Sequence, residues 1–366
     1  METQHVPRER DVILDAWRGI SILLVILHHA VYFRFGEVFR GFLEVSLPAS
    51  ASFLYRSLWM LDYALVEFSE RAGPLGVKIF FVISGYIITK LLIEEELRAK
   101  TIDVWGFYFR RVVRILPALL LYVCSVFLFS LFGWVAFDAP SLFAALGFVC
   151  NTELVLCSQP LIHTWTLSIE EQFYILWPLV FILVSAHWRS VFLAASFLVL
   201  IILSALEIFI AYDWINNPQA YACIVIGVLY ASSAGWKRFV DRWGIVMTIL
   251  CAACIVALAQ IPGFGEIARK LYWSVTPFAL LAMVMGSYAV KDWIPAILIR
   301  ALAFLGLFSY SLYLWQEIFL MEKQHYLVGS PLEWTFLLIP VTLASYYFLE
   351  QPLIRWGKRV YRASRP

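Results

Sequence analysis

Four ionisable side chains interrupt an apolar segment near the beginning of the chain. The segment LDAWRGISILLVILHHAVYF contains Asp15, Arg18, His28 and His29. Ionisable groups are costly inside a membrane, so each of them is a candidate functional residue. Arg18 and His29 are eleven residues apart, and a helix would place them within about 20° of one face and about 16 Å apart along its axis. One face of the helix would then carry both a cation and a titratable base. A structural histidine and an arginine that extends its charged group to the membrane surface would give the same pattern.

A second cluster of basic residues lies at the start of another apolar segment. The run WGFYFRRVVRILP contains Arg110, Arg111 and Arg114, and their spacing predicts that all three share one side of a helix. Guanidinium groups bind phosphates through paired hydrogen bonds. An anion with several phosphates, such as a nucleotide or coenzyme A, would fit this side. A plain cytoplasmic anchor of positive charge is the alternative interpretation.

A third cluster combines carboxylates, a histidine and aromatic rings in the run IHTWTLSIEEQFYILWP. Its candidate residues are His163, Trp165, Ser168, Glu170, Glu171, Gln172 and Tyr174. Ser168 and Glu171 match the S-x-x-E capping box with which many helices begin. Capping does not account for two adjacent carboxylates beside an apolar run. Glu170 and Glu171 are therefore candidates to hold a histidine or to bind a sugar hydroxyl.

The segments that carry these clusters are expected to be transmembrane helices. The chain has 366 residues, of which 62% are hydrophobic and 15% charged, with a formal net charge of +2. Soluble proteins have about 45–50% apolar and about 25% charged residues, so this composition excludes a soluble enzyme, a disordered chain and a nucleic-acid-binding domain. We predict an all-α, polytopic bundle of about ten helices. The predicted segments lie near 13–33, 75–93, 115–136, 168–186, 191–212, 219–234, 244–261, 274–290, 303–321 and 334–350.

We expect residues 1–366 to form one integral membrane domain without an appended soluble domain. Lysines and arginines favour the cytoplasmic side of membranes, and most of the 28 in this chain lie on that side if both termini are cytoplasmic. This orientation makes 34–74 an outer loop, with an interfacial helix near 51–68. It also places Cys150 and Cys157 outside, where they could form a disulfide if that compartment is oxidising.

Several motifs, taken in their order along the chain, resemble one protein family. They are LDAWRGISILLVILHHA, GVKIFFVISGYIITKLL, FYFRRVVRILPA, HTWTLSIEEQFYILWPL, SYSLYLWQ and LEQPLIRW. In this order they are similar to the acyltransferase type 3 family of integral membrane O-acyltransferases, over nearly the whole chain. Two positions depart from the family pattern. His28 stands where members commonly have phenylalanine, and Gln316 stands where histidine is often found, so Gln316 is assigned no catalytic role.

The resemblance implies a membrane-embedded O-acyltransferase in a bacterial inner membrane. It would move an acyl group, such as acetyl, from cytoplasmic acyl-coenzyme A to a hydroxyl of a cell-surface polysaccharide, a lipopolysaccharide or a lipid-linked glycan. The thioester supplies the driving force, so no metal is expected. The alternatives are a small-molecule acceptor such as a macrolide, a glycolipid flippase without acyl transfer, and a non-catalytic scaffold of the cell envelope.

The resemblance also implies roles for individual residues. His29 is expected to act as a general base or to carry the acyl group briefly, because an imidazole titrates near working pH. Glu170 or Glu171 would orient His29 or the acceptor. Coenzyme A is expected to bind Arg18, Arg110, Arg111 and Arg114, and the acceptor to contact His163, Trp165 and Tyr174.

Overall fold

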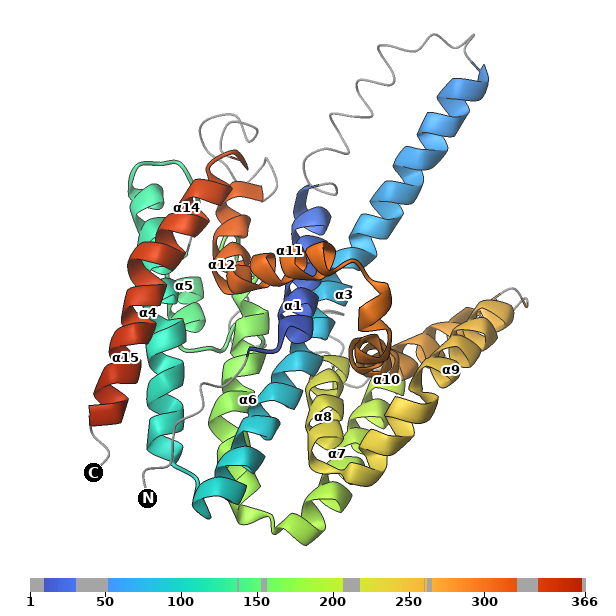
Figure 1. Ribbon diagram of the computed structural model, residues 1–366. Helices are drawn as coiled ribbons and strands as arrows, with labels where there is room; N and C mark the ends of the chain where they lie inside the picture. The colour runs from blue at the N-terminus through green and yellow to red at the C-terminus, as the bar shows by residue number, and fades with distance from the viewer. Residues whose placement is uncertain are drawn as a thin grey trace.

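The protein is described by a computed structural model over residues 10–30, 52–136, 138–152, 157–206, 218–259, 261, 265–320 and 335–363. These residues form helices joined by short connections (Figure 1). The elements are α1 (Val12–Leu27), α3 (Ser52–Ala99), α4 (Val104–Leu131), α5 (Ala139–Leu146), α6 (Thr164–Leu183), α7 (Ala186–Ala205), α8 (Pro218–Ser232), α9 (Ala234–Ala259), α10 (Gly265–Val290), η2 (Lys291–Trp293), α11 (Ala296–Leu307), α12 (Ser309–Leu320), α14 (Leu338–Ala344), η4 (Ser345–Glu350) and α15 (Gln351–Ala363).

The all-α, polytopic architecture predicted from the sequence is confirmed. Within the described ranges, seven helices are long and apolar enough to cross a membrane, or eight if the bent pair α11 and α12 is one span. Every predicted segment overlaps a helix, because an apolar run in lipid satisfies its backbone polar groups by forming one. Some of these helices, such as α8, are shorter than a full span. The number of crossings therefore stays a prediction, as does the cytoplasmic position of both termini.

The longest helix, α3, packs against both α1 and α8. It continues without a break from Ser52 to Ala99, so the helix predicted near 51–68 belongs to the same element as the span that follows. The part of the predicted outer loop before residue 52 lies outside the described residues. Apolar side chains on the span of α3 are mostly buried, whereas those of α7 and α9 are mostly exposed, as expected for helices that face lipid.

Glycines allow the backbones of neighbouring helices to touch. A Cβ on Gly19 of α1 would lie 2.0 Å from the Leu302 carbonyl oxygen of α11, and a Cβ on Gly306 of α11 would lie 2.0 Å from the Asp15 carbonyl oxygen of α1. Gly85 of α3 meets the backbone of α8 in the same way. Such contacts between small residues are common where helices associate in membranes. They fix α1, which carries the first cluster of ionisable residues, against α11.

We expect Gly306→Ala to destabilise the protein by about 1–3 kcal/mol, because the new methyl group would overlap backbone that cannot move aside cheaply. The midpoint of thermal unfolding of the purified protein in detergent measures this effect. Gly235→Ala is the matched control, since its Cβ would meet only the Ser233 hydroxyl, at 3.9 Å. Equal unfolding midpoints for the two variants would contradict the close contact between α1 and α11.

Candidate active site

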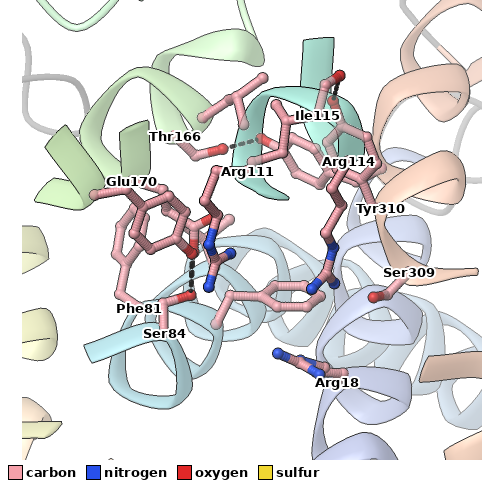
Figure 2. A pocket seen from close by; sticks show the side chains of 15 residues that line it. Arg18, Phe81, Ser84, Arg111, Arg114, Ile115, Thr166, Glu170, Ser309 and Tyr310 are labelled. Atoms are coloured by element: carbon pink, nitrogen blue, oxygen red, sulfur yellow. Dashed lines mark hydrogen bonds between the residues drawn. The ribbon is translucent and has the colours of Figure 1, made fainter. Parts of the chain in front are cut away.

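A cavity with charged and apolar lining lies among α1, α3, α4, α6 and α12, with about 730 Å³ of empty volume that includes open solvent at its mouth. Its charged lining consists of Arg18 from α1, Arg111 and Arg114 from α4, and Glu170 from α6. Figure 2 shows the three guanidinium groups directed toward one space, with Ser309 and Tyr310 of α12 on its far side. The rest of the lining is Val77, Phe80, Phe81, Ser84, Ile115, Thr166, Leu167, Tyr174 and Tyr313.

The start of α4 decides which arginines reach the cavity. Asp103 caps this helix by accepting a hydrogen bond from the Gly106 amide at 2.8 Å. Adjacent residues of a helix point about 100° apart, so Arg110 and Arg111 cannot face the same space. The Arg110 guanidinium lies over the Tyr361 ring of α15, 4.6 Å from its centroid, and 3.9 Å from Glu95. The prediction that all three arginines share one side of the helix is therefore wrong. Arg111 and Arg114 line the cavity, and Arg110 does not.

Carboxylates and aromatic rings offset part of the positive charge in the cavity. Asp15 lies one helical turn before Arg18, with an oxygen 3.2 Å from its guanidinium, and Asp15 also pairs with Arg10. The Arg111 guanidinium lies over the Tyr174 ring, 4.4 Å from its centroid. Cation–π contacts of this kind are strongest where water is excluded. These contacts stabilise Arg18 and Arg111, whose guanidinium groups still line the cavity.

The two adjacent carboxylates of α6 lie with the arginines. Glu170 accepts a hydrogen bond from the Ser84 hydroxyl of α3 at 2.5 Å, and Tyr174 donates to the same hydroxyl at 3.0 Å (Figure 2). Glu171 is buried within electrostatic range of Arg111. The sequence suggested that one of these carboxylates holds His29, but the carboxylate found beside His29 belongs to a different helix.

That carboxylate is Glu317 of α12. His29 lies in a π-helical turn at the end of α1, and its Nε2 is 3.3 Å from a Glu317 carboxylate oxygen. Its Nδ1 is 2.9 Å from the Val25 carbonyl oxygen. A carbonyl only accepts, so Nδ1 must carry a hydrogen. A hydrogen bond between Nε2 and the Glu317 carboxylate requires one proton, which either group can carry.

Sequence reasoning missed Glu317, although a signal for it was present. Glu317 is a carboxylate in an apolar segment, the same feature that marked Glu170, and it directly follows Gln316, which drew attention instead. The Gln316 side chain donates to Glu317 at 3.0 Å, and Gln159 also forms a side-chain hydrogen bond with it. Glu317 is 1% exposed, so these donors replace water around a buried carboxylate.

The third cluster of the sequence is divided between two places. Tyr174 and Glu170 line the arginine cavity, whereas His163, just before α6, lies within electrostatic range of both Glu317 and His29. The His163 ring packs edge-on against Tyr122, with centroids 5.3 Å apart. Trp165 packs against Phe81 of α3, with ring centroids 6.3 Å apart. One end of α6 therefore approaches the His29–Glu317 pair, and residues further along it reach the arginines.

The predicted capping role of Ser168 is wrong. α6 begins at Thr164, one turn earlier, because a series of turn hydrogen bonds over residues 158–165 leads the chain directly into the helix. The Ser168 hydroxyl instead donates to the Thr164 carbonyl at 2.9 Å, as serine does inside helices. It also accepts from the Cys150 amide at 3.2 Å. Ser168 thereby ties the preceding loop to α6.

A disulfide closes that loop. Cys150 and Cys157 are bonded, with their Cα atoms 5.4 Å apart, and both are buried. Beside them, Asp138 accepts hydrogen bonds from the hydroxyls of Ser141 and Ser158. Burial raises the pKa of the Asp138 carboxyl, but these hydrogen bonds outweigh burial and hold that pKa below its usual value. Disulfides form in oxidising compartments, which supports an outer position for this loop.

In the part of the chain that the structure describes, no group of three or more histidine, cysteine, aspartate or glutamate residues is arranged to hold a metal ion.

The fold and site define a polytopic membrane protein with a cavity of arginines near a buried histidine–carboxylate pair. The chain belongs to the acyltransferase type 3 family, whose model, described as an acyltransferase domain, matches residues 11–350. The family resemblance recognised in the sequence is thereby confirmed. No solved structure matches the chain.

Three curated relatives are similar to the chain. It is 29% identical over 330 residues to the O-acetyltransferase OatA of Staphylococcus aureus, covering 79% of this chain and 54% of the relative. It is 28% identical over 353 residues to the putative peptidoglycan O-acetyltransferase YrhL of Bacillus subtilis, covering 83% of this chain and 54% of the relative. It is 31% identical over 140 residues to the peptidoglycan O-acetyltransferase OatA of Listeria monocytogenes, covering 32% of this chain and 21% of the relative. The chain spans about half the length of the first two relatives.

We expect four of the six cysteines to react with a thiol reagent when the unreduced protein, produced in membranes, is denatured and alkylated. These are Cys124, Cys223, Cys251 and Cys254. Peptide mass mapping should find Cys150 linked to Cys157, and prior reduction should make all six cysteines reactive. Alkylated Cys150 or Cys157 in the unreduced sample would contradict the disulfide.

Proposed function

We propose that the protein is a membrane O-acetyltransferase that uses acetyl-coenzyme A from the cytoplasm and a hydroxyl of a cell-envelope glycan. The observation that carries the proposal is the cavity of Arg18, Arg111 and Arg114 near the His29–Glu317 pair, in a member of an acyltransferase family. Relatives are named for O-acetylation, two of them of peptidoglycan. Peptidoglycan is therefore the acceptor that we favour over lipopolysaccharide or a small molecule.

The arginine cavity is the proposed binding site for the donor. Coenzyme A carries several phosphate charges, and arginine forks bind phosphate with paired hydrogen bonds. Arg111 and Arg114 lie near the start of α4 and Arg18 lies on α1. Apolar lining residues such as Phe81 and Leu167 would contact the acyl arm. Arg110, which the sequence grouped with the others, is left out of this proposal because it lies over Tyr361.

The His29–Glu317 pair is proposed to carry out proton transfer. The acceptor oxygen attacks the thioester carbonyl carbon, a carbon–oxygen bond forms and the carbon–sulfur bond breaks. The hydroxyl proton passes to the pair, and the pair returns a proton to the departing thiolate, which leaves as free thiol. Attack by the His29 imidazole first, with a short-lived acyl-histidine, remains the alternative route. In either route Glu317 fixes the ring and compensates the charge that develops on it.

The remaining predicted site residues receive separate roles in this proposal. Glu170 and Glu171 set the charge of the donor cavity, since they lie with Arg111 and Ser84. His163 is proposed to contact the acceptor near Glu317. The charge distribution supports a bacterial inner membrane location with both termini in the cytoplasm, which leaves the disulfide-bonded loop on the acceptor side.

We expect His29→Ala and Glu317→Gln to lower acetyl transfer by about 10²- to 10⁴-fold, the usual contribution of general acid–base catalysis. Mass spectrometry of envelope glycans would measure the ester, in cells that carry each variant as their only copy. His187→Ala and Glu94→Gln are matched controls, because both residues are exposed and lie away from the pair. Near-normal acetylation by a folded His29→Ala variant would contradict the catalytic assignment.

We expect Arg111→Ala to raise the KM for acetyl-coenzyme A by about tenfold or more, since a hydrogen bond to a charged group contributes about 1.5–3 kcal/mol. Steady-state release of the coenzyme A thiol measures KM. Arg110→Ala is the neighbouring control and should change KM little, because its guanidinium lies over Tyr361. If the two variants had the same donor KM, the cavity would not be the donor site.

A further inference from the structure

The His29–Glu317 pair does not line the arginine cavity. The described residues that line the cavity include Tyr313 and Thr166, and they do not include His29 or Glu317. An acyl group that travels from the arginines to His29 must therefore pass whatever separates the two. Side chains that adjoin both sites are therefore the ones that could restrict the size of the acyl group.

Tyr313 of α12 lies near both sites. It lies within electrostatic range of Glu170, which lines the cavity, and of Glu317, which pairs with His29. Its ring centroid is 5.4 Å from that of His163. Along α12, Tyr313 lies one helical turn before Glu317 and thus on nearly the same face. The side chain therefore adjoins both the donor cavity and the catalytic pair.

Two hydrogen bonds hold the Tyr313 hydroxyl in place. It donates to the His163 carbonyl oxygen at 2.7 Å and accepts from the Thr166 hydroxyl at 2.6 Å. Thr166 is seen in Figure 2 at the edge of the cavity beside Arg111. Moving the ring aside would break both bonds in an interior that offers little water to replace them. The ring is therefore a fixed obstacle rather than a freely rotating side chain.

We propose that Tyr313 sets the length of the acyl group that the enzyme transfers, by admitting acetyl past its ring and obstructing longer chains. This inference rests on the proposed function, because it assumes a thioester donor in the arginine cavity. A pocket of fixed size discriminates by about 10- to 200-fold in kcat/KM between substrates that differ by one methylene group. The hydroxyl bonds of Tyr313 keep the obstacle rigid, so both the ring and its anchoring contribute to the selection.

The test compares acetyl-, butyryl- and octanoyl-coenzyme A as donors for the purified full-length chain in detergent. An N-acetylglucosamine oligomer serves as acceptor probe, and thiol release and the ester mass on the oligomer are recorded together. Wild type should strongly prefer acetyl. Tyr313→Ala should raise the butyryl-to-acetyl ratio of kcat/KM by about tenfold or more, and Tyr313→Phe should raise it less, since the ring stays but loses its anchors.

Tyr310→Phe is the matched control. Tyr310 lines the same cavity, and its hydroxyl donates to the Ile115 carbonyl oxygen at 2.8 Å, but it is not between the two sites. Its variant should keep the wild-type ratio, whatever happens to the absolute rate. The ratio is the readout because a merely structural role of Tyr313 would lower all donors together.

Three results would count against the inference. An unchanged ratio in active Tyr313→Ala, or in active Tyr313→Phe if the alanine variant fails to fold, overturns the selection of chain length. Folded variants without any acetyl transfer would show that Tyr313 is needed for the reaction itself, which also overturns it. Wild type that releases no thiol from any donor contradicts the proposed function, and the inference falls with it.

Discussion

Ionisable side chains in the interior of this bundle depend on partners supplied by other helices. Hydrocarbon offers neither hydrogen bonds nor counter-charges, so an isolated ion there is costly. Polar pairs in the described structure join elements far apart in the sequence, such as Glu170 of α6 with Ser84 of α3 and His29 of α1 with Glu317 of α12. Removing one member would leave the other uncompensated. The helix packing and the polar interior therefore require each other.

Hydrogen bonds to neighbouring helices distinguish a structural arginine from the arginines that face the cavity. Arg189 of α7 makes two bonds of 2.8 Å to the Glu96 carboxylate of α3 and two more to carbonyl oxygens near the end of α6. Each of its three nitrogen atoms donates within the protein, and the residue ties three helices together. Arg111 instead lies against the rings of Phe107 and Tyr174 and directs its guanidinium into the cavity. Arg189 is buried and bonded to other helices, whereas Arg111 is partly exposed and faces the cavity.

The helix α6 organises the interior because its residues serve two neighbouring places. His163 at its beginning lies near the His29–Glu317 pair, and Glu170 and Tyr174 lie with the arginines. The loop before α6 is fixed by the disulfide and by the hydrogen bond from the Cys150 amide to the Ser168 hydroxyl. The disulfide and this hydrogen bond restrict the loop, and the bond from the Tyr313 hydroxyl to the His163 carbonyl oxygen joins His163 to α12.

The sequence by itself determined the helical class, the approximate extent of the apolar helices and the presence of Arg18 and His29 on one helix. These follow from local apolar runs and the period of 3.6 residues, which neighbouring residues fix. Tertiary structure alone decided that Glu317 pairs with His29 and that Arg110 turns toward Tyr361 of α15. Such partners come from distant parts of the chain, and helix packing brings them together, so no local spacing records the choice.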